Sequence, residues 1–137
     1  MKETRAYARL KRLHPRAHWQ RVEGWATTGA FDTNACLRGV EVWVENKQVE
    51  LPARTRTKLR VRVRKTQVVW ELERRRAGGR TYVALLVGKH LLLLPGSSLA
   101  ALAEGMTYDQ LKMFELSQAT LFEPGGAVFA SEHRGLV

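Results

Sequence analysis

The sequence predicts an α/β domain in which a central mixed β-sheet is flanked by helices. Three observations support this fold class. Val40 to Lys47 mostly alternates apolar and polar side chains, which is the period of a half-buried strand. Two apolar runs, Thr81 to Val87 and His90 to Leu94, predict two more strands with a tight turn between them. Helical patterns extend over Lys2 to Leu13 and over Gln67 to Ala77.

Length and composition limit the class of protein. The chain has 137 residues, of which 45% are hydrophobic, and this is enough for one domain with its own core. No apolar run approaches the roughly 18–20 residues that span a membrane, and no signal-peptide core follows Met1. Cys36 is the only cysteine, which excludes an intrachain disulfide and a cysteine-rich zinc site. These features predict a cytoplasmic protein in a reducing compartment.

The net charge of +10 is the strongest compositional feature. A small domain this basic usually binds a polyanion. Nucleic acid fits better than a membrane surface, because no clearly amphipathic basic helix with an aromatic and leucine face stands out. The alternative is a charged surface that serves solubility alone.

The first helix is predicted over Lys2 to Leu13, where a narrow apolar stripe runs among basic residues. Pro15 ends it. Glu3 lies in its first turn, where an acid is favourable near the positive end of the helix dipole.

A strand is predicted over His18 to Gly24. It contains Glu23, nine residues before Asp32. Glu23 has two interpretations: an ion pair with a cation such as Arg21, or a further acid of a catalytic site.

The central candidates for chemistry are Asp32, Glu45 and Lys47. Residues two apart in a strand point to the same face, so Glu45 and Lys47 are neighbours on one face of the predicted strand. The apolar residues between and before them face the core on the other side; these are Val40, Val42 and Val44. A short hairpin turn near residues 37–39 would bring Asp32 beside Glu45.

Two adjacent carboxylates repel each other unless a cation lies between them. Mg²⁺ prefers oxygen ligands and is usually held by one or two carboxylates together with substrate phosphate. Lys47 would then orient an attacking water or stabilise the charge that develops on phosphate. The alternative is structural: a surface ion pair between Glu45 and Lys47, with Asp32 capping a turn.

A basic run, called the basic ribbon from here on, follows the central strand. Its cations fall at almost every second position: Arg54, Arg56, Lys58, Arg60, Arg62, Arg64 and Lys65. A strand or extended loop would place the cations of residues 58–64 on one face, where they could follow a phosphate backbone independently of sequence. The alternative is an edge strand that charge protects from aggregation.

Thr66 is predicted to cap the next helix, Gln67 to Ala77, with Val68, Val69 and Leu72 facing the core. Beyond the two strands, short helices are predicted over Ser97 to Ala103 and over Thr107 to Ser117. We expect one domain over residues 1–121 and a loosely ordered tail over residues 122–137.

These motifs resemble the PD-(D/E)xK nuclease superfamily. The spacing Asp-x12-Glu-x-Lys, a preceding glycine and a later Gln-x-x-Trp carry the resemblance, which extends along most of the chain. Within that superfamily the chain looks like phage-encoded nucleases and Holliday-junction resolvases of the archaeal type. Gly29-Ala30-Phe31-Asp32 stands where the family has Gly-x-Pro-Asp, so Phe31 replaces the usual proline. Because proline is not a ligand, this departure affects only the local turn.

The resemblance implies a restriction-endonuclease-like fold and a metal-dependent catalytic site. Asp32 and Glu45 would bind Mg²⁺, for which Mn²⁺ could substitute, and Lys47 would position water and stabilise charge. Gln67 would bind water or phosphate near the metal, and Glu23 would assist. In some resolvases of the superfamily a glutamate on the first helix completes the metal site, which gives Glu3 a second interpretation.

The function that the resemblance implies is DNA cleavage that depends on structure. We expect a Holliday-junction resolvase that acts as a homodimer on four-way DNA, because a two-fold junction needs two symmetric cuts. One alternative is another phage DNA-processing or repair nuclease of the same fold. A second is a non-catalytic DNA-binding protein that assists recombination.

Overall fold

The fold is built on one five-stranded mixed β-sheet. The computed structural model describes residues 4–22 and 29–124. The strands lie in the order β1-β2-β3-β4-β5, with β3 and β4 parallel and every other neighbouring pair antiparallel. Their bounds are β1 His18–Arg21, β2 Thr33–Leu37, β3 Val40–Val49, β4 Thr81–Val87 and β5 His90–Pro95. The predicted α/β class, a central mixed sheet flanked by helices, is confirmed.

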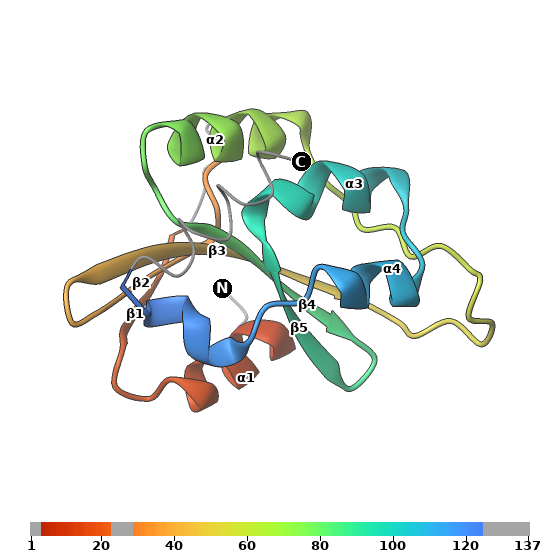
Figure 1. The fold of residues 1–137 in the computed structure, drawn as a ribbon, viewed down its shortest axis with the longest axis horizontal. Helices are drawn as coiled ribbons and strands as arrows, with labels where there is room; N and C mark the ends of the chain where they lie inside the picture. Colours follow the sequence, from red (N-terminus) through yellow and green to blue (C-terminus); the bar gives the residue numbers. More distant parts are fainter. Residues whose placement is uncertain (1–3, 23–28, 125–137) are drawn as a thin grey trace.

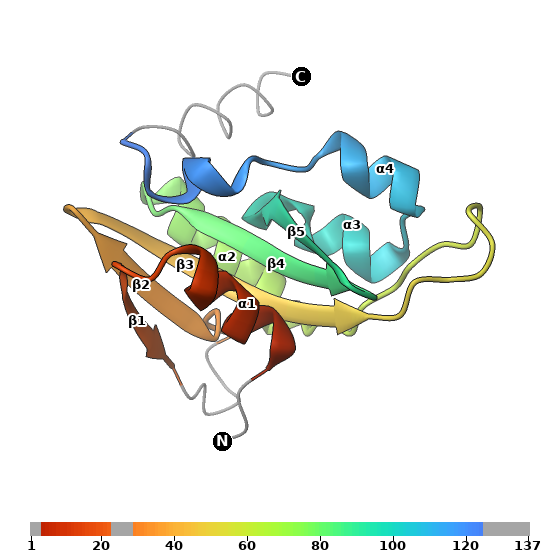
Figure 2. The same cartoon turned by 90° about the horizontal axis from the view of Figure 1, so that it is seen from below.

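Helices cover both faces of the sheet (Figure 1). Helix α1 lies on one face, while α2, which connects the parallel strands β3 and β4, lies on the other with α3 (Figures 1 and 2). The bounds are α1 Arg5–Leu13, α2 Lys65–Arg76, α3 Leu99–Glu104 and α4 Tyr108–Met113, with 3₁₀ turns η1 Gly96–Ser98 and η2 Gln118–Phe122. Among the described residues, no helix is long and apolar enough to cross a membrane.

The predicted hairpin turn before β3 is confirmed. Leu37 pairs with Val40 across a two-residue turn. Both turn residues, Arg38 and Gly39, have positive φ angles, of 51° and 81°, as in the tight turns that match the twist of a hairpin. The register then pairs Thr33 with Val44. Asp32, the residue before β2, therefore lies beside Glu45.

The sheet separates two apolar cores. On the α1 face, Leu10 packs with Val42, Val44 and Tyr82. On the opposite face, residues of β4 and β5 pack against α3 and against the apolar residues of the basic ribbon. All seven residues of β4 are buried, because this strand lies inside the sheet and is covered on both faces.

Helix α2 differs from the prediction in its start and in its buried face. It begins at Lys65, with Arg64 rather than Thr66 as the N-cap. The prediction that Val69 faces the core is wrong, since this side chain is 53% exposed. The most buried residues of α2 are instead Gln67 and Glu71, because the sheet beneath presents polar partners to the helix.

The ends of the packed domain also differ from the prediction. Helix α1 begins at Arg5 with Thr4 as its cap, and Glu3 lies outside the described residues. Phe122, which the sequence assigned to the tail, is buried and contacts Trp19 and His14 edge-on. Aromatic burial therefore extends the packed domain through residue 122, while residues 125–137 lie outside the described part of the chain.

Candidate active site

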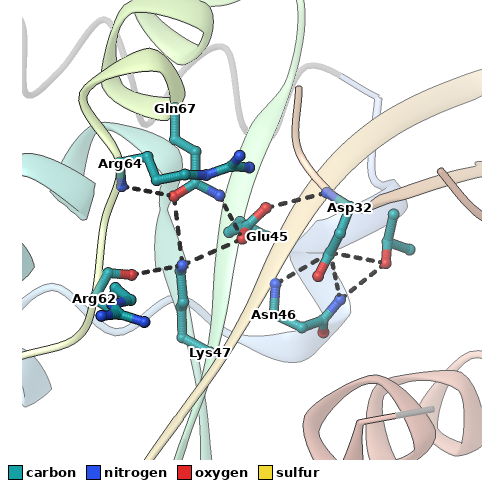
Figure 3. Close-up of polar contacts among 8 residues, drawn as sticks. Asp32, Glu45, Asn46, Lys47, Arg62, Arg64 and Gln67 are labelled. Carbon is teal, nitrogen blue, oxygen red and sulfur yellow. Dashed lines mark hydrogen bonds and ion pairs between the residues drawn. The ribbon is translucent and has the colours of Figure 1, made fainter. Parts of the chain in front are cut away.

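Glu45 and Lys47 lie on the face of β3 that α2 covers, as the strand period predicts. Glu45 is only 5% exposed. Asp32 lies one residue before β2, and its backbone N–H donates to Glu45 Oε1 at 3.1 Å. Figure 3 shows the side chains of Asp32 and Glu45 as neighbours. They lie at the open end of the β2–β3 hairpin, away from its turn. The structure thus brings the two predicted metal ligands together.

Gln67 reaches Glu45 from the first turn of α2. Its Nε2 donates to Glu45 Oε2 at 2.8 Å. Its Oε1 accepts from the backbone N–H of Arg64 at 3.1 Å, which is half of a capping box. The helix start therefore fixes the orientation of the Gln67 amide, and the N–H₂ group faces the carboxylate. Sequence reasoning reached Gln67 only through the family resemblance.

Three oxygen atoms surround the Lys47 ammonium group. Its Nζ donates to the backbone carbonyl of Arg62 at 2.7 Å and to Gln67 Oε1 at 3.4 Å. Glu45 Oε2 lies 3.4 Å away in an ion pair. The lysine charge is held beside Glu45, and one of the three contacts comes from the basic ribbon (Figure 3).

Asp32 is held by two residues that the sequence analysis did not single out. Its Oδ1 accepts from the Asn46 backbone N–H at 3.3 Å and from Asn46 Nδ2 at 2.9 Å. Thr33 Oγ1 donates to the same oxygen at 3.1 Å and accepts from Asn46 Nδ2 at 2.9 Å. A sequence signal exists: Asn46 follows Val40, Val42 and Val44 on the inward face of the strand, where an amide needs partners.

Burial and mutual repulsion disfavour two negative charges in this site. The pKa of Glu45 is raised from an ordinary 4.5 to about 7, mainly by burial and further by the charge of Asp32, while Lys47 opposes the rise. Burial also raises the pKa of Asp32, against hydrogen bonds from Asn46 and Thr33 and the charge of Arg21. A bound cation would relieve this repulsion.

The donor set fits Mg²⁺. Both candidate ligands are carboxylates, and one or two carboxylates with substrate phosphate are the usual protein contribution to a magnesium site. Within residues 4–22 and 29–124, no group of three or more His, Cys, Asp and Glu side chains is placed to hold a metal. The two other predicted acids, Glu3 and Glu23, lie outside the described residues.

The loop before Asp32 packs directly against the start of α2. Gly29 has a φ of +71°, and a Cβ atom there would lie 2.1 Å from the carbonyl oxygen of Thr66. Phe31 is fully buried and contacts Trp70 at a ring-centroid distance of 5.0 Å. Phe31 therefore serves as an apolar anchor of this loop on α2.

The basic ribbon is an extended segment that lies outside the named strands. Residues 50–64 project beyond the end of β3 and return to α2 (Figures 1 and 2). Lys58, Arg60, Arg62 and Arg64 are exposed, while Leu59 and Val61 are buried. The alternation thus presents the cations to solvent, as expected.

The end of the ribbon reaches the candidate site. Arg62 and Arg64 line a cavity of about 370 Å³ together with Lys47 and Gln67. Arg54 and Arg56 lie in the exposed turn farther out. Positive charge is therefore continuous from the projecting turn to Lys47.

No protein-family model and no curated protein matches this chain. Among solved structures, the chain is similar to Hjc of Archaeoglobus fulgidus, a Holliday junction resolvase from an archaeal hyperthermophile. The match has a TM-score of 0.49 and 16% sequence identity, and it covers 79% of this chain and 95% of that chain. At this identity, most positions differ between the two proteins.

Proposed function

We propose that this protein is a metal-dependent endonuclease that cleaves branched DNA, and that its substrate is the four-way junction. The observation that carries the proposal is the convergence on Glu45 of three predicted site residues. The Asp32 N–H and the Gln67 amide bind its two oxygens, and the Lys47 ammonium lies 3.4 Å from Oε2. A surface ion pair does not require the buried glutamate or the glutamine contact.

In the proposed reaction, water attacks a phosphodiester in line and leaves 5′-phosphate and 3′-hydroxyl ends. Asp32 and Glu45 would hold Mg²⁺, which when bound supplies Lewis-acid stabilisation of charge on the phosphate. Lys47, held by the Arg62 carbonyl, would add positive charge where the phosphate oxygens become more negative. Gln67 keeps Glu45 in place through its capped amide.

DNA would be bound by its backbone along the basic ribbon. The exposed cations from Arg54 to Lys65 offer contacts to phosphate that carry no sequence information. This suits recognition of shape, and a homodimer would place two such sites symmetrically about the two-fold axis of a junction. Binding of this kind weakens steeply as salt is added.

The test is cleavage of a labelled four-way junction and of linear duplex of the same sequence, with Mg²⁺ and with EDTA. Glu45→Gln removes the candidate ligand. Glu41→Gln is the matched control, because Glu41 is an exposed glutamate of the same strand. We expect paired nicks on the junction for the wild type and for Glu41→Gln, and none with EDTA or for Glu45→Gln.

Three other outcomes separate the alternatives. Equal cutting of duplex and junction would leave a nuclease and exclude the resolvase. Cutting that survives both EDTA and Glu45→Gln would place the chemistry elsewhere. Salt-sensitive DNA binding without cutting in any metal would indicate a DNA-binding accessory protein.

A further inference from the structure

The two oxygens of Asp32 have different surroundings. Oδ1 accepts three hydrogen bonds, from the Asn46 backbone, the Asn46 side chain and the Thr33 hydroxyl. A carboxylate oxygen offers about two lone-pair positions, so Oδ1 is saturated. No described residue donates to Oδ2. Asp32 is therefore held in one orientation, with a single oxygen available to a ligand.

The Asn46 side chain is oriented by the same network. Nδ2 donates to both Asp32 Oδ1 and Thr33 Oγ1 at 2.9 Å. A flipped amide would place its oxygen against the carboxylate, which the charge disfavours. In the observed orientation Asn46 Oδ1 is buried and has no hydrogen-bond partner among the described residues, and Asn46 as a whole is only 7% exposed.

An unpartnered buried oxygen is unfavourable for folding. The preceding positions on this face of β3 are Val40, Val42 and Val44, and a fourth valine at position 46 would continue the apolar face without an orphaned oxygen. Asn46 is thus a poor choice for stability alone, while both of its N–H donors are directed at Asp32 and its partner Thr33.

We propose that Asn46, with Thr33, is a positioning residue that acts through Asp32: it saturates Oδ1 and leaves Oδ2 as the atom that binds the divalent cation. This inference rests on the proposed function, and it deepens it by naming the ligand atom and the residues that present it. Partners that orient a metal ligand typically contribute 10- to 100-fold to metal affinity.

The first test measures Mn²⁺ binding to the full-length protein without DNA. Titration calorimetry and electron paramagnetic resonance of free Mn²⁺ give the affinity. Asn46→Val is expected to weaken Mn²⁺ binding about 10-fold or more while the melting temperature is unchanged or raised. Asn34→Ala is the matched control. Asn34 is an asparagine of the same sheet whose amide donates to the Val42 carbonyl, and its removal should leave Mn²⁺ affinity unchanged.

A second pair of variants tests the network independently. Thr33→Val removes the hydroxyl that donates to Asp32 and accepts from Asn46, and it is expected to weaken Mn²⁺ binding several-fold. Thr33→Ser keeps the hydroxyl and should restore wild-type affinity, which a purely structural role of this position would not require. If Asn46→Val fails to fold, this pair decides the question.

The possible failures are distinguishable. Wild-type Mn²⁺ affinity in folded Asn46→Val and in Thr33→Val would overturn the positioning role and leave the nuclease proposal intact. A wild-type protein that binds Mn²⁺ no better than Glu45→Gln would overturn the metal site, and with it both proposals.

Discussion

The two helices α1 and α2, which cover opposite faces of the sheet, bury opposite kinds of side chain. Helix α1 buries Ala6, Tyr7 and Leu10 against an apolar face. Helix α2 buries Gln67 and Glu71, which bind polar groups of the sheet, and α3 supplies apolar cover on that side. Burying apolar area is favourable outright, whereas a buried polar group must recover its lost hydration through hydrogen bonds. Helix α1 therefore contributes apolar packing, whereas the buried face of α2 contributes polar contacts, among them the contact of Gln67 with Glu45.

The largest expected effect tests the apolar packing of α1. Leu10 is fully buried under α1, so Leu10→Ala should lower the free energy of unfolding by about 3 kcal/mol, measured by urea denaturation. Leu13→Ala is the control on the same helix, because Leu13 is 52% exposed. Junction cleavage by the folded fraction should be unchanged in both. A loss of cleavage in folded Leu10→Ala would contradict this contrast between the two helices.

The second prediction concerns pH on the α2 face. The pKa of Glu45 is raised from 4.5 to about 7 by burial and by Asp32, so the folded protein binds this proton more tightly than the unfolded chain. The resulting stabilisation is complete below the unfolded pKa and is lost as pH rises through about 7. At about 1.4 kcal/mol per pKa unit, it amounts to about 3 kcal/mol at most.

Urea denaturation in EDTA at several pH values, for wild type and Glu45→Gln, measures this contribution. Relative to the variant, the wild type should lose up to about 3 kcal/mol between about pH 5 and about pH 8. A difference between the two proteins that stays constant with pH would show that Glu45 does not titrate in this window.

A smaller effect is expected at Glu71, the other buried polar residue of α2. Its carboxylate accepts from Thr81 Oγ1 at 2.7 Å and from Arg75 Nε at 2.9 Å. Glu71→Ala leaves the buried hydroxyl without its partner and should lower the free energy of unfolding by about 2 kcal/mol. Glu73→Ala, at an exposed position of the same helix, should change it by less than about 0.5 kcal/mol. Equal losses in the two variants would mean that the contacts of Glu71 do not stabilise the fold.

The smallest effect is expected at Val69. Because this side chain is 53% exposed, Val69→Ala should leave the free energy of unfolding within about 0.5 kcal/mol of the wild type. The better helix propensity of alanine should offset the small loss of burial. A decrease in the free energy of unfolding of more than about 1 kcal/mol would instead support the buried position of Val69 that the sequence pattern predicts.

Sequence patterns were most informative where burial is apolar. The alternation over Val40 to Lys47 correctly predicted the faces of β3, and the two apolar runs predicted β4 and β5. The same logic failed at α2, where it directed Val69 inward. Hydrophobic periodicity assumes that the buried face is apolar, and the buried face of α2 is the polar one, set by Glu45 and Thr81 beneath it.

The candidate site could be predicted only in part for a related reason. Glu45 and Lys47 follow from strand period, and the hairpin places Asp32 beside them. Asn46 was missed because alternation assigns it to the face opposite Glu45. The carboxylate of Asp32 lies where the Asn46 backbone and side chain both reach it, a contact at the end of a strand that periodicity does not describe.

Gly29 has a consequence for recognising relatives of this chain. Its backbone lies so close to Thr66 that any side chain would collide with the helix. Phe31, by contrast, is held by an apolar ring contact with Trp70, which another apolar side chain could also make. In an alignment of chains that share this site, we expect glycine to be invariant three residues before the aspartate. We expect the apolar residue immediately before the aspartate, Phe31 here, to vary. Glycine is therefore the better diagnostic position in a search for distant relatives.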